Sequence, residues 1–421
     1  MWKINWRIWL LLAAGVSTSF AALGQTAVQP RSPAPLCIDA VCPPDETESS
    51  PQGIKWHPGF YVWYTPSNNF VNYEPSHQQA ILNFIDSIGN EPSIKGIQVI
   101  GYWGEFESDT AGDYSNGFAS VDAILARLQK YGKYLQVAIN PAHFGSYPPA
   151  NYAQFFPKYL VQPENGGTDY SGKYGISLMD RSPDGLQARV WQTATSDRFI
   201  AMIRAYGARY NGHPNFEMIG FGETSINTNI GTDGFSWPAL DEQIRRHLAA
   251  ARAAFPNTGV RFVANWYFTN PAMISLIDYA VSLGCAIGGP DVLPNEAIAA
   301  NQAFAGAGIG GTPSTDWRGV VPFVSEVQSP ELGGGEGTWT NEQLYLSAMQ
   351  GVATKSGGAT GSGTAVYRAV RPQYFVWYYN DWAGGAEQQW RTGTLPFIRK
   401  INGAVASTSC PKGYKSGCRT D

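Results

Sequence analysis

Residues 216–225 read FEMIGFGETS, a short apolar run with strong β-propensity that ends at a glutamate. Seven other runs of this kind recur along the chain, and segments with helical periodicity lie between them. The eight predicted strands are Phe60–Tyr64, Gly96–Tyr102, Leu135–Asn140, Phe216–Gly222, Val260–Trp266, Ala286–Pro290, Val321–Glu326 and Tyr374–Tyr379. Strands that alternate with helices predict a parallel sheet, and eight such units predict an α/β fold of the closed (β/α)8 TIM-barrel type. An open doubly wound sheet is the alternative fold.

The helical segments between these strands have clear start and stop signals. Pro75-Ser76 and Asn270-Pro271 supply residues suited to a helix start, and Gly89, Gly132, Gly207 and Gly284 are predicted to end helices. The predicted helices are Ser76–Ile88, Ala119–Tyr131, Ser196–Tyr210, Ala239–Ala254, Pro271–Leu283, Asn295–Ala305, Asn341–Val352 and Glu387–Ile401.

Two connections are longer than a barrel needs. One runs from Pro141 to about Asp184, and the other is the glycine-rich stretch Gly306–Gly319. In a barrel such insertions fall at the carboxyl ends of the strands, where they wall a cleft. We therefore expect long loops on the catalytic face.

The amino terminus has the pattern of a secretory signal. Lys3 and Arg7 precede an apolar run, and small residues follow near Ala22 and Gly24. The domain prediction is a signal peptide at 1–24, a Pro/Ser-rich arm at 25–52, a barrel at 53–403 and a tail at 404–421. Signal cleavage would release a secreted or periplasmic protein with no membrane anchor.

The five cysteines fit an exported protein. Cys37 and Cys42 lie close together in the arm, and Cys410 and Cys418 lie close together in the tail, so each pair can close a local disulfide. Cys285 is left over in an apolar run and is predicted to be a buried free thiol.

Composition excludes several classes of protein. Hydrophobic residues make up 43% of the 421 residues and charged residues only 15%, which is inconsistent with a coiled coil or a largely disordered chain. A net charge of -4 gives no basic surface for nucleic acid. Dinucleotide and P-loop motifs are absent from the sequence, and the five scattered histidines predict no dedicated metal site, so we expect no cofactor.

Two glutamates stand where predicted strands end. Glu223 follows the fourth strand and Glu326 ends the seventh. The carboxyl ends of barrel strands carry the active site in enzymes of this architecture, and a carboxylate after an apolar strand is costly to bury without a role. Paired carboxylates are what glycoside hydrolysis requires, since one protonates the leaving oxygen and the other attacks the anomeric carbon or activates water.

A glutamate on strand four and another on strand seven is the pattern of the clan A glycoside hydrolases, which this sequence resembles over Trp56–Ile401. The resemblance implies that Glu223 is the acid/base and Glu326 the nucleophile, with retention of configuration at a spacing of about 5–5.5 Å. Many clan members have Asn just before the acid/base, where this chain has Gly222. A chitinase-like pattern would need acidic residues where Ile219 and Phe221 stand.

Aromatic and polar side chains at the predicted strand ends suit a sugar, which stacks its apolar face on Trp or Tyr and hydrogen-bonds at its edges. Trp377 resembles the strand-eight Trp that floors the central sugar subsite in the clan. The other candidates for substrate binding are Trp266, Trp103, Glu105, Asn140, His143, Asn265, Tyr267 and Asp291.

The sequence therefore predicts a secreted retaining glycoside hydrolase that acts on a poly- or oligosaccharide. One alternative is a saccharide-binding barrel without catalysis. Another is a different hydrolase or lyase with a metal held by Glu105, Asp291 and a histidine.

Overall fold

The computed structural model describes residues 53–64, 75–143, 155–161, 175–178, 185–226, 232–292, 299–328, 339–355, 364–379 and 390–420. The predicted signal peptide and the arm with Cys37 and Cys42 lie outside these residues.

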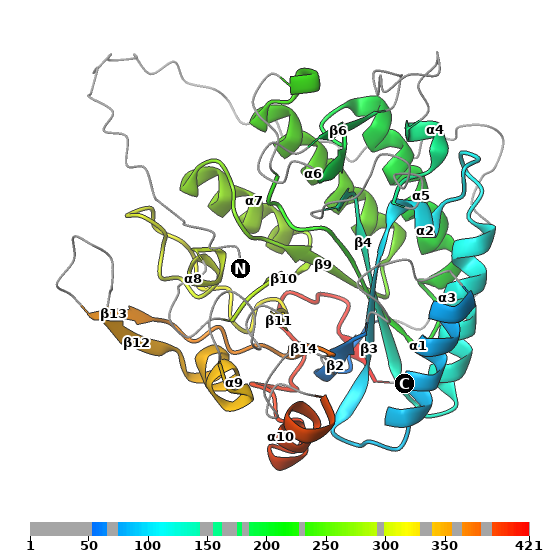
Figure 1. The fold of residues 1–421 in the computed structure, drawn as a ribbon. Helices are drawn as coiled ribbons and strands as arrows, with labels where there is room; N and C mark the ends of the chain where they lie inside the picture. Colours follow the sequence, from blue (N-terminus) through cyan, green and yellow to red (C-terminus); the bar gives the residue numbers. More distant parts are fainter. Residues whose placement is uncertain are drawn as a thin grey trace, which may run out of the picture. The chain divides into compact units, whose positions relative to one another are not determined.

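Eight parallel strands close into a barrel, as the sequence predicts (Figure 1). Among the barrel strands, the largest difference between predicted and observed bounds is at β9, which is predicted to end at Trp266 and ends at Val263. In chain order the barrel strands are β2 (Gly59–Trp63), β3 (Ile94–Tyr102), β4 (Tyr134–Asn140), β8 (Phe216–Phe221), β9 (Gly259–Val263), β10 (Ala286–Gly289), β11 (Phe323–Val327) and β14 (Tyr374–Tyr378).

Helices pack outside the strands and bury the main hydrophobic core against them (Figure 1). They are α1 (Pro75–Ile88), α3 (Ser115–Gln129), α5 (Thr193–Tyr210), α6 (Trp237–Ala254), α7 (Asn270–Ser282), α8 (Ala299–Phe304), α9 (Asn341–Gln350) and α10 (Leu395–Lys400). Within the described ranges, no helix has both the length and the apolar character that crossing a bilayer requires.

The helix signals act mostly as predicted, with one difference. Helix α7 begins at Asn270-Pro271 as predicted, and it is capped by Thr269, whose Oγ1 accepts from the backbone N–H of Ala272 at 3.3 Å. Gly207 does not end a helix but lies inside α5. A Cβ at Gly207 would lie 2.5 Å from the carbonyl oxygen of Ala254, so this glycine allows α5 and α6 to approach closely.

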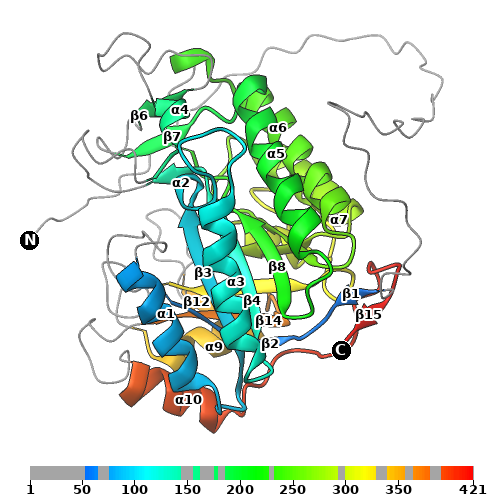
Figure 2. The same cartoon turned by 90° about the vertical axis from the view of Figure 1, so that its right-hand side faces the viewer.

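The long connection after β4 carries its own small elements at the carboxyl ends of the strands (Figure 2). Strand β7 (Leu186–Ala188) pairs with β5 (Ala142–His143) on one side and with β6 (Ile176–Leu178) on the other. Two short helices, α2 (Trp103–Phe106) and α4 (Lys158–Val161), lie at the same end. A hairpin of β12 (Val352–Lys355) and β13 (Thr364–Tyr367) precedes β14.

The opposite end of the barrel is closed by the two chain segments that flank it. Strand β1 (Ile54–Lys55) pairs with β15 (Cys418–Arg419). Trp56 and Tyr414 pack against the residues that fill the barrel interior at this end. Cys410 and Cys418 form the disulfide that their spacing predicts.

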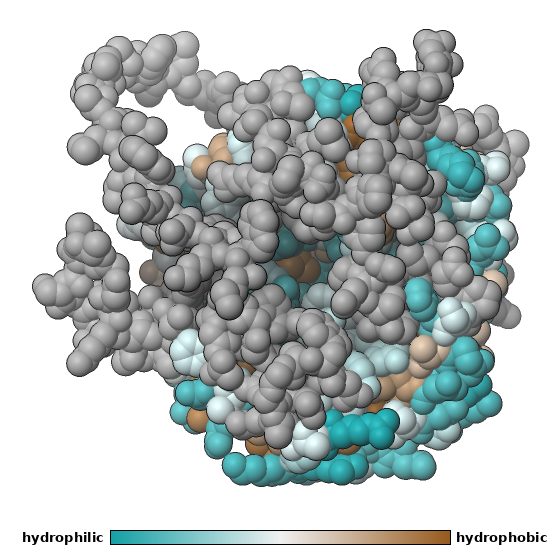
Figure 3. All heavy atoms as spheres, viewed as in Figure 1, coloured by the Kyte–Doolittle hydropathy of each residue, from teal (hydrophilic) through white to brown (hydrophobic). Residues whose placement is uncertain are grey.

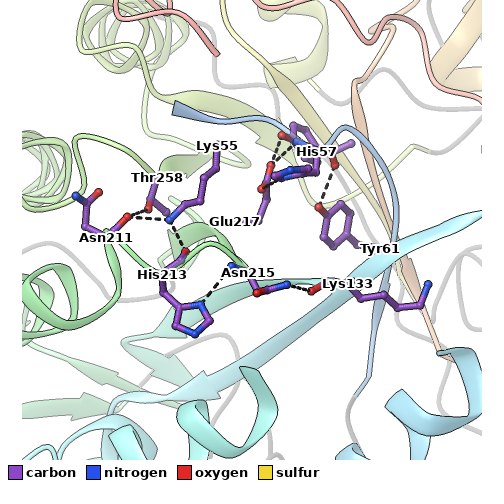
Figure 4. A network of polar contacts seen from close by, with 10 residues as sticks. Lys55, His57, Tyr61, Lys133, Asn211, His213, Asn215, Glu217 and Thr258 are labelled. Carbon is purple, nitrogen blue, oxygen red and sulfur yellow. Dashed lines mark hydrogen bonds and ion pairs between the residues drawn. The ribbon is translucent and has the colours of Figure 1, made fainter. Parts of the chain in front are cut away.

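A buried polar network lies at this closed end (Figure 4). The Glu217 carboxylate accepts from His57 Nδ1 at 2.7 Å, from the His57 backbone N–H at 2.9 Å and from the Tyr374 hydroxyl at 2.6 Å. Burial alone would raise the pKa of Glu217, but these bonds and the charge of His57 outweigh it and hold the pKa below its usual value. Lys55 Nζ donates to the carbonyls of Asn211 and His213, which anchors the entering chain.

Candidate active site

A cavity of about 490 Å³ opens at the carboxyl end of the barrel and contains both predicted glutamates. Glu326 is the fourth residue of β11, and Glu223 lies two residues beyond the end of β8. All barrel strands are parallel, so their carboxyl ends meet at one mouth. In the space-filling view, hydrophobic and hydrophilic residues of the described part both appear in a hollow near the centre of the face (Figure 3).

Glu326 is buried and fixed by two donors. Its Oε1 accepts from Arg261 Nη1 at 2.5 Å and from Gln98 Nε2 at 2.8 Å. Arg261 Nη1 also donates to Gln98 Oε1 at 3.1 Å, so the three side chains form a closed triangle. Within the described residues, Oε2 of Glu326 accepts no hydrogen bond, which leaves one carboxylate oxygen for a ligand.

Glu223 has a different environment. Its Oε2 accepts a short hydrogen bond from the Asn265 amide. Burial raises the pKa of the Glu223 carboxyl; the Asn265 hydrogen bond opposes this, and the charge of Glu326 adds to the rise. Glu223 therefore holds its proton to higher pH than an ordinary glutamate.

The ends of β8 and β9 are tied together next to Glu223. Thr224 Oγ1 accepts from the backbone N–H of Asn265 at 3.0 Å and donates to the carbonyl of Trp266 at 3.1 Å. These bonds fix the backbone that carries the Asn265 amide, and so they fix the direction from which Glu223 receives its hydrogen bond.

Of the predicted substrate-binding residues, Asn140 and His143 line the cavity. Asn140 ends β4 and lies over Gly222, the residue before Glu223. His143 is buried, and its ring stacks on Phe155 at a centroid distance of 4.1 Å. Asn265 reaches the site through its bond to Glu223.

Two of the predicted stacking residues are in the wrong place for a sugar. Trp377 is fully buried on the outer side of β14, where its Nε1–H donates to Asn341 Oδ1 at 3.1 Å. Side chains alternate along a strand, and Tyr374 and Val376 take the interior positions. Trp103 is also fully buried, and its Nε1–H donates to Glu107 Oε2 at 2.7 Å.

Three polar or aromatic candidates do not line the described cavity. Glu105 is buried and accepts from the backbone N–H of Tyr102 at 2.6 Å. The hydroxyl of Tyr267 lies 3.1 Å from an Asp241 carboxylate oxygen and donates to it. Asp291 follows Pro290, which lines the cavity, but Asp291 itself does not.

Trp266 lies at the same end of the barrel but outside the cavity. It is 46% exposed, and its ring packs edge-to-face on Trp237 at 5.4 Å. A role in substrate binding remains a prediction for this residue.

Side chains outside our predicted substrate-binding set also line the cavity, among them Trp63, Gln98, Gln136 and Arg261. Gln98, Gln136 and Arg261 are polar residues inside otherwise apolar strands. The argument that singled out the two glutamates, the cost of burying a polar group without a role, applies equally to them.

Within the described ranges, no group of three or more His, Cys, Asp and Glu side chains is arranged to hold a metal ion. The trio of Glu105, Asp291 and a histidine is therefore not assembled among these residues.

No family model and no curated protein matches this chain. Among solved structures, the chain is similar to the GH5_18 protein of Streptomyces cattleya in complex with GlcNAc, at 14% identity over 84% of this chain and 80% of that chain, with a TM-score of 0.48. It is similar to endo-glycoceramidase II of Rhodococcus sp. at 12% identity over 84% and 81%, with a TM-score of 0.48. It is also similar to the β-galactosidase of Rahnella sp. R3 at 12% identity over 84% and 56%, with a TM-score of 0.46. At these identities and scores, the similarities carry no argument about function.

Proposed function

We propose that the protein is a retaining glycoside hydrolase, with Glu223 as general acid/base and Glu326 as nucleophile. One observation carries this proposal: two carboxyls line one cavity, one of them paired with an arginine and the other with a raised pKa. Glu326 is paired with Arg261, whereas burial and the charge of Glu326 raise the pKa of Glu223. A carboxyl with a raised pKa suits the general acid, and a carboxylate held by an arginine suits the nucleophile.

In the first step, an oxygen of the Glu326 carboxylate attacks the anomeric carbon, and the bond from that carbon to the leaving oxygen breaks. The Glu223 carboxyl gives its proton to that leaving oxygen, so the aglycone departs as a neutral alcohol. Arg261 and Gln98 hold the Glu326 oxygen that does not attack.

In the second step, water attacks the same carbon and releases Glu326. Glu223, now a carboxylate beside Asn265, takes a proton from that water and returns to its starting state. Two inversions at one carbon give net retention.

The lining of the cavity suits a saccharide. Trp63 presents a partly buried ring braced edge-to-face by Tyr378 at 5.1 Å, and Asn140 and His143 add polar groups to the lining. This combination matches the apolar face and polar edge of a pyranose. A poly- or oligosaccharide outside the cytoplasm is the substrate class that we propose, because the amino-terminal sequence has the features of an export signal.

The test uses a panel of aryl glycosides of both anomeric configurations, followed by the active substrate with Glu223→Ala and Glu326→Ala. Activity should fall by roughly 10²–10⁴-fold in Glu223→Ala and below detection in Glu326→Ala. Glu105→Gln is the control, because Glu105 is a buried glutamate at the same end that does not line the cavity.

Added azide distinguishes the two roles. It should react with the glycosyl-enzyme in Glu223→Ala to give a glycosyl azide of retained configuration, and replace the missing carboxylate in Glu326→Ala to give the inverted one. Binding of saccharide with no release of reducing ends by the wild type would instead favour the non-catalytic alternative.

A further inference from the structure

The floor of the cavity carries polar atoms that have no partner. Gln136 Nε2 and Oε1 and Arg261 Nε and Nη2 are all buried and make no hydrogen bond within the described part of the chain. Gln136 is 1% exposed and Arg261 2% exposed, and both line the same cavity as the two glutamates. Buried polar groups in proteins are nearly always hydrogen-bonded, so these four atoms indicate that a ligand or solvent completes the floor.

The two side chains reach the floor from neighbouring parts of the barrel wall. Gln136 on β4 lies opposite Gln98 on β3, and Arg261 on β9 lies opposite Gly220 on β8. A Cβ at Gly220 would lie 3.4 Å from Arg261 Cβ and 3.7 Å from its Cδ, so the arginine chain runs past this glycine toward Gln98 and Glu326.

Arg261 divides its donors between two tasks. Nη1 serves Glu326 and Gln98, whereas Nε and Nη2 have no partner. The Nε–Nη2 edge of a guanidinium presents two parallel N–H bonds, and this fork fits the two oxygens of a carboxylate.

The unpartnered atoms are rich in donors. Arg261 offers one N–H on Nε and two on Nη2, and Gln136 offers two on Nε2 against a single acceptor, Oε1. A sugar hydroxyl brings a donor of its own into a place that already has too many donors. Its single oxygen also cannot pair with both N–H bonds of the arginine fork in parallel. A carboxylate accepts from the fork and from the amide together.

We propose, building on the glycosidase function above, that this floor binds the carboxylate of a uronic acid residue held against Glu326. Arg261 would bind it through Nε and Nη2, and Gln136 through Nε2. Glu326 and Arg261 offset each other's charge, so the recognition comes from the fixed direction of these donors as much as from net charge. The substrate class is then a uronic-acid-containing glycan.

The kinetic test compares aryl glycosides that differ only at C6: glucuronide against glucoside, and galacturonide against galactoside, in both anomeric forms. For one such pair, we expect kcat/KM of the wild type to be at least tenfold higher on the uronide. Gln136→Leu should lower that uronide-to-neutral ratio at least tenfold. Gln187→Leu is the matched control, because Gln187 is a buried glutamine with an unpartnered Oε1 outside this cavity, and it should leave the ratio unchanged.

Equal or better cleavage of the neutral sugar by the wild type, or an unchanged ratio in Gln136→Leu, would overturn the proposal while the glycosidase function stands. Binding is measured separately, as the rise in Tm of the wild type with glucuronate or galacturonate against glucose or galactose. If no glycoside of either kind is cleaved, the binding proposal can still be tested. A rise in Tm that occurs with a uronate but not with the neutral sugar, and that is lost in Gln136→Leu, would support carboxylate binding at the floor. Absence of that selective rise would mean that water fills the floor.

Discussion

The side chain of Asn140 occupies the space next to the Cα of Gly222. A Cβ on residue 222 would lie 2.5 Å from Asn140 Oδ1 and 3.0 Å from Pro141 Cδ. The space beside residue 222 is therefore filled from the neighbouring strand, by an amide that lines the same cavity.

The first prediction follows from this contact. Gly222→Ala should displace Asn140 and lower kcat/KM by about tenfold, because a misplaced contact at the reacting sugar weakens transition-state binding. Adding Asn140→Ala removes the closer of the two contacts but also the amide, so thermal stability should recover in part while activity stays low.

Gly212→Ala is the control for the glycine substitution itself, since a Cβ at Gly212 meets nothing within 4 Å. Recovery of activity in the Gly222→Ala/Asn140→Ala double variant would contradict a role for the Asn140 amide.

A second prediction concerns pH. The Asn265 hydrogen bond favours the ionised form of Glu223 and so lowers its pKa against the effect of burial. Asn265→Ala should raise the pKa of Glu223, and since the first step needs the protonated acid, the alkaline limb of the kcat/KM profile should move to higher pH. A shift to lower pH would contradict the assignment of Glu223 as the acid.

A third prediction concerns the closed end of the barrel. Glu217→Ala leaves His57 and Tyr374 without their buried acceptor, and we expect a loss of about 3–5 kcal/mol in the free energy of unfolding. The comparison is the exposed pair of Lys400 and Glu342, 3.5 Å apart, where Lys400→Ala should cost less than about 1 kcal/mol. Urea denaturation measures both.

The same group predicts an acid dependence of stability. The pKa of Glu217 is lowered in the folded protein, so its stabilisation is complete above the unfolded pKa and is lost as pH falls through the lowered folded value. Glu217→Gln should flatten the fall of unfolding free energy over that acidic range. If the slope of unfolding free energy against pH stays the same in Glu217→Gln, other groups cause the acid dependence.

A fourth prediction concerns the tail. The Cys410–Cys418 bond closes a loop with a sequence separation of 8 and holds β15 against β1. Cys410→Ser/Cys418→Ser should cost about 2.5 kcal/mol of unfolding free energy. Cys285→Ala, which changes a buried free thiol and keeps the Cys410–Cys418 bond, is the comparison, and reducing agent should lower its stability more than that of the double variant.

The sequence is sufficient to predict the barrel because the same strand pattern occurs eight times along the chain. Each strand is a run of β-prone residues bounded by turn residues, so an error of a few positions, as at the end of β9, leaves the topology unchanged. Gly207 was misread because a glycine in a helical pattern indicates a helix end as readily as a close helix contact, and only the partner helix α6 distinguishes the two.

The site is less readable because it depends on which face each side chain takes. Trp377 is predicted to face the site, but successive side chains of a strand point to opposite faces. Val376 points into the barrel, so Trp377 points out. Gln98 and Gln136 could have been found by asking why polar residues interrupt apolar strands. The bond from Arg261 to Glu326 joins β9 and β11, and it needs the closed barrel to be seen.

The central claim is that Glu326 forms a covalent bond to the sugar. The most direct measurement is intact-mass and peptide analysis after incubation with 2-deoxy-2-fluoro glycosides of the sugar that proves active, which slow the second step. We predict a mass increase of one fluorosugar per chain, located on the peptide at Glu326 and absent in Glu326→Ala. Label on another residue, or full turnover with inverted configuration and no label, would contradict the account.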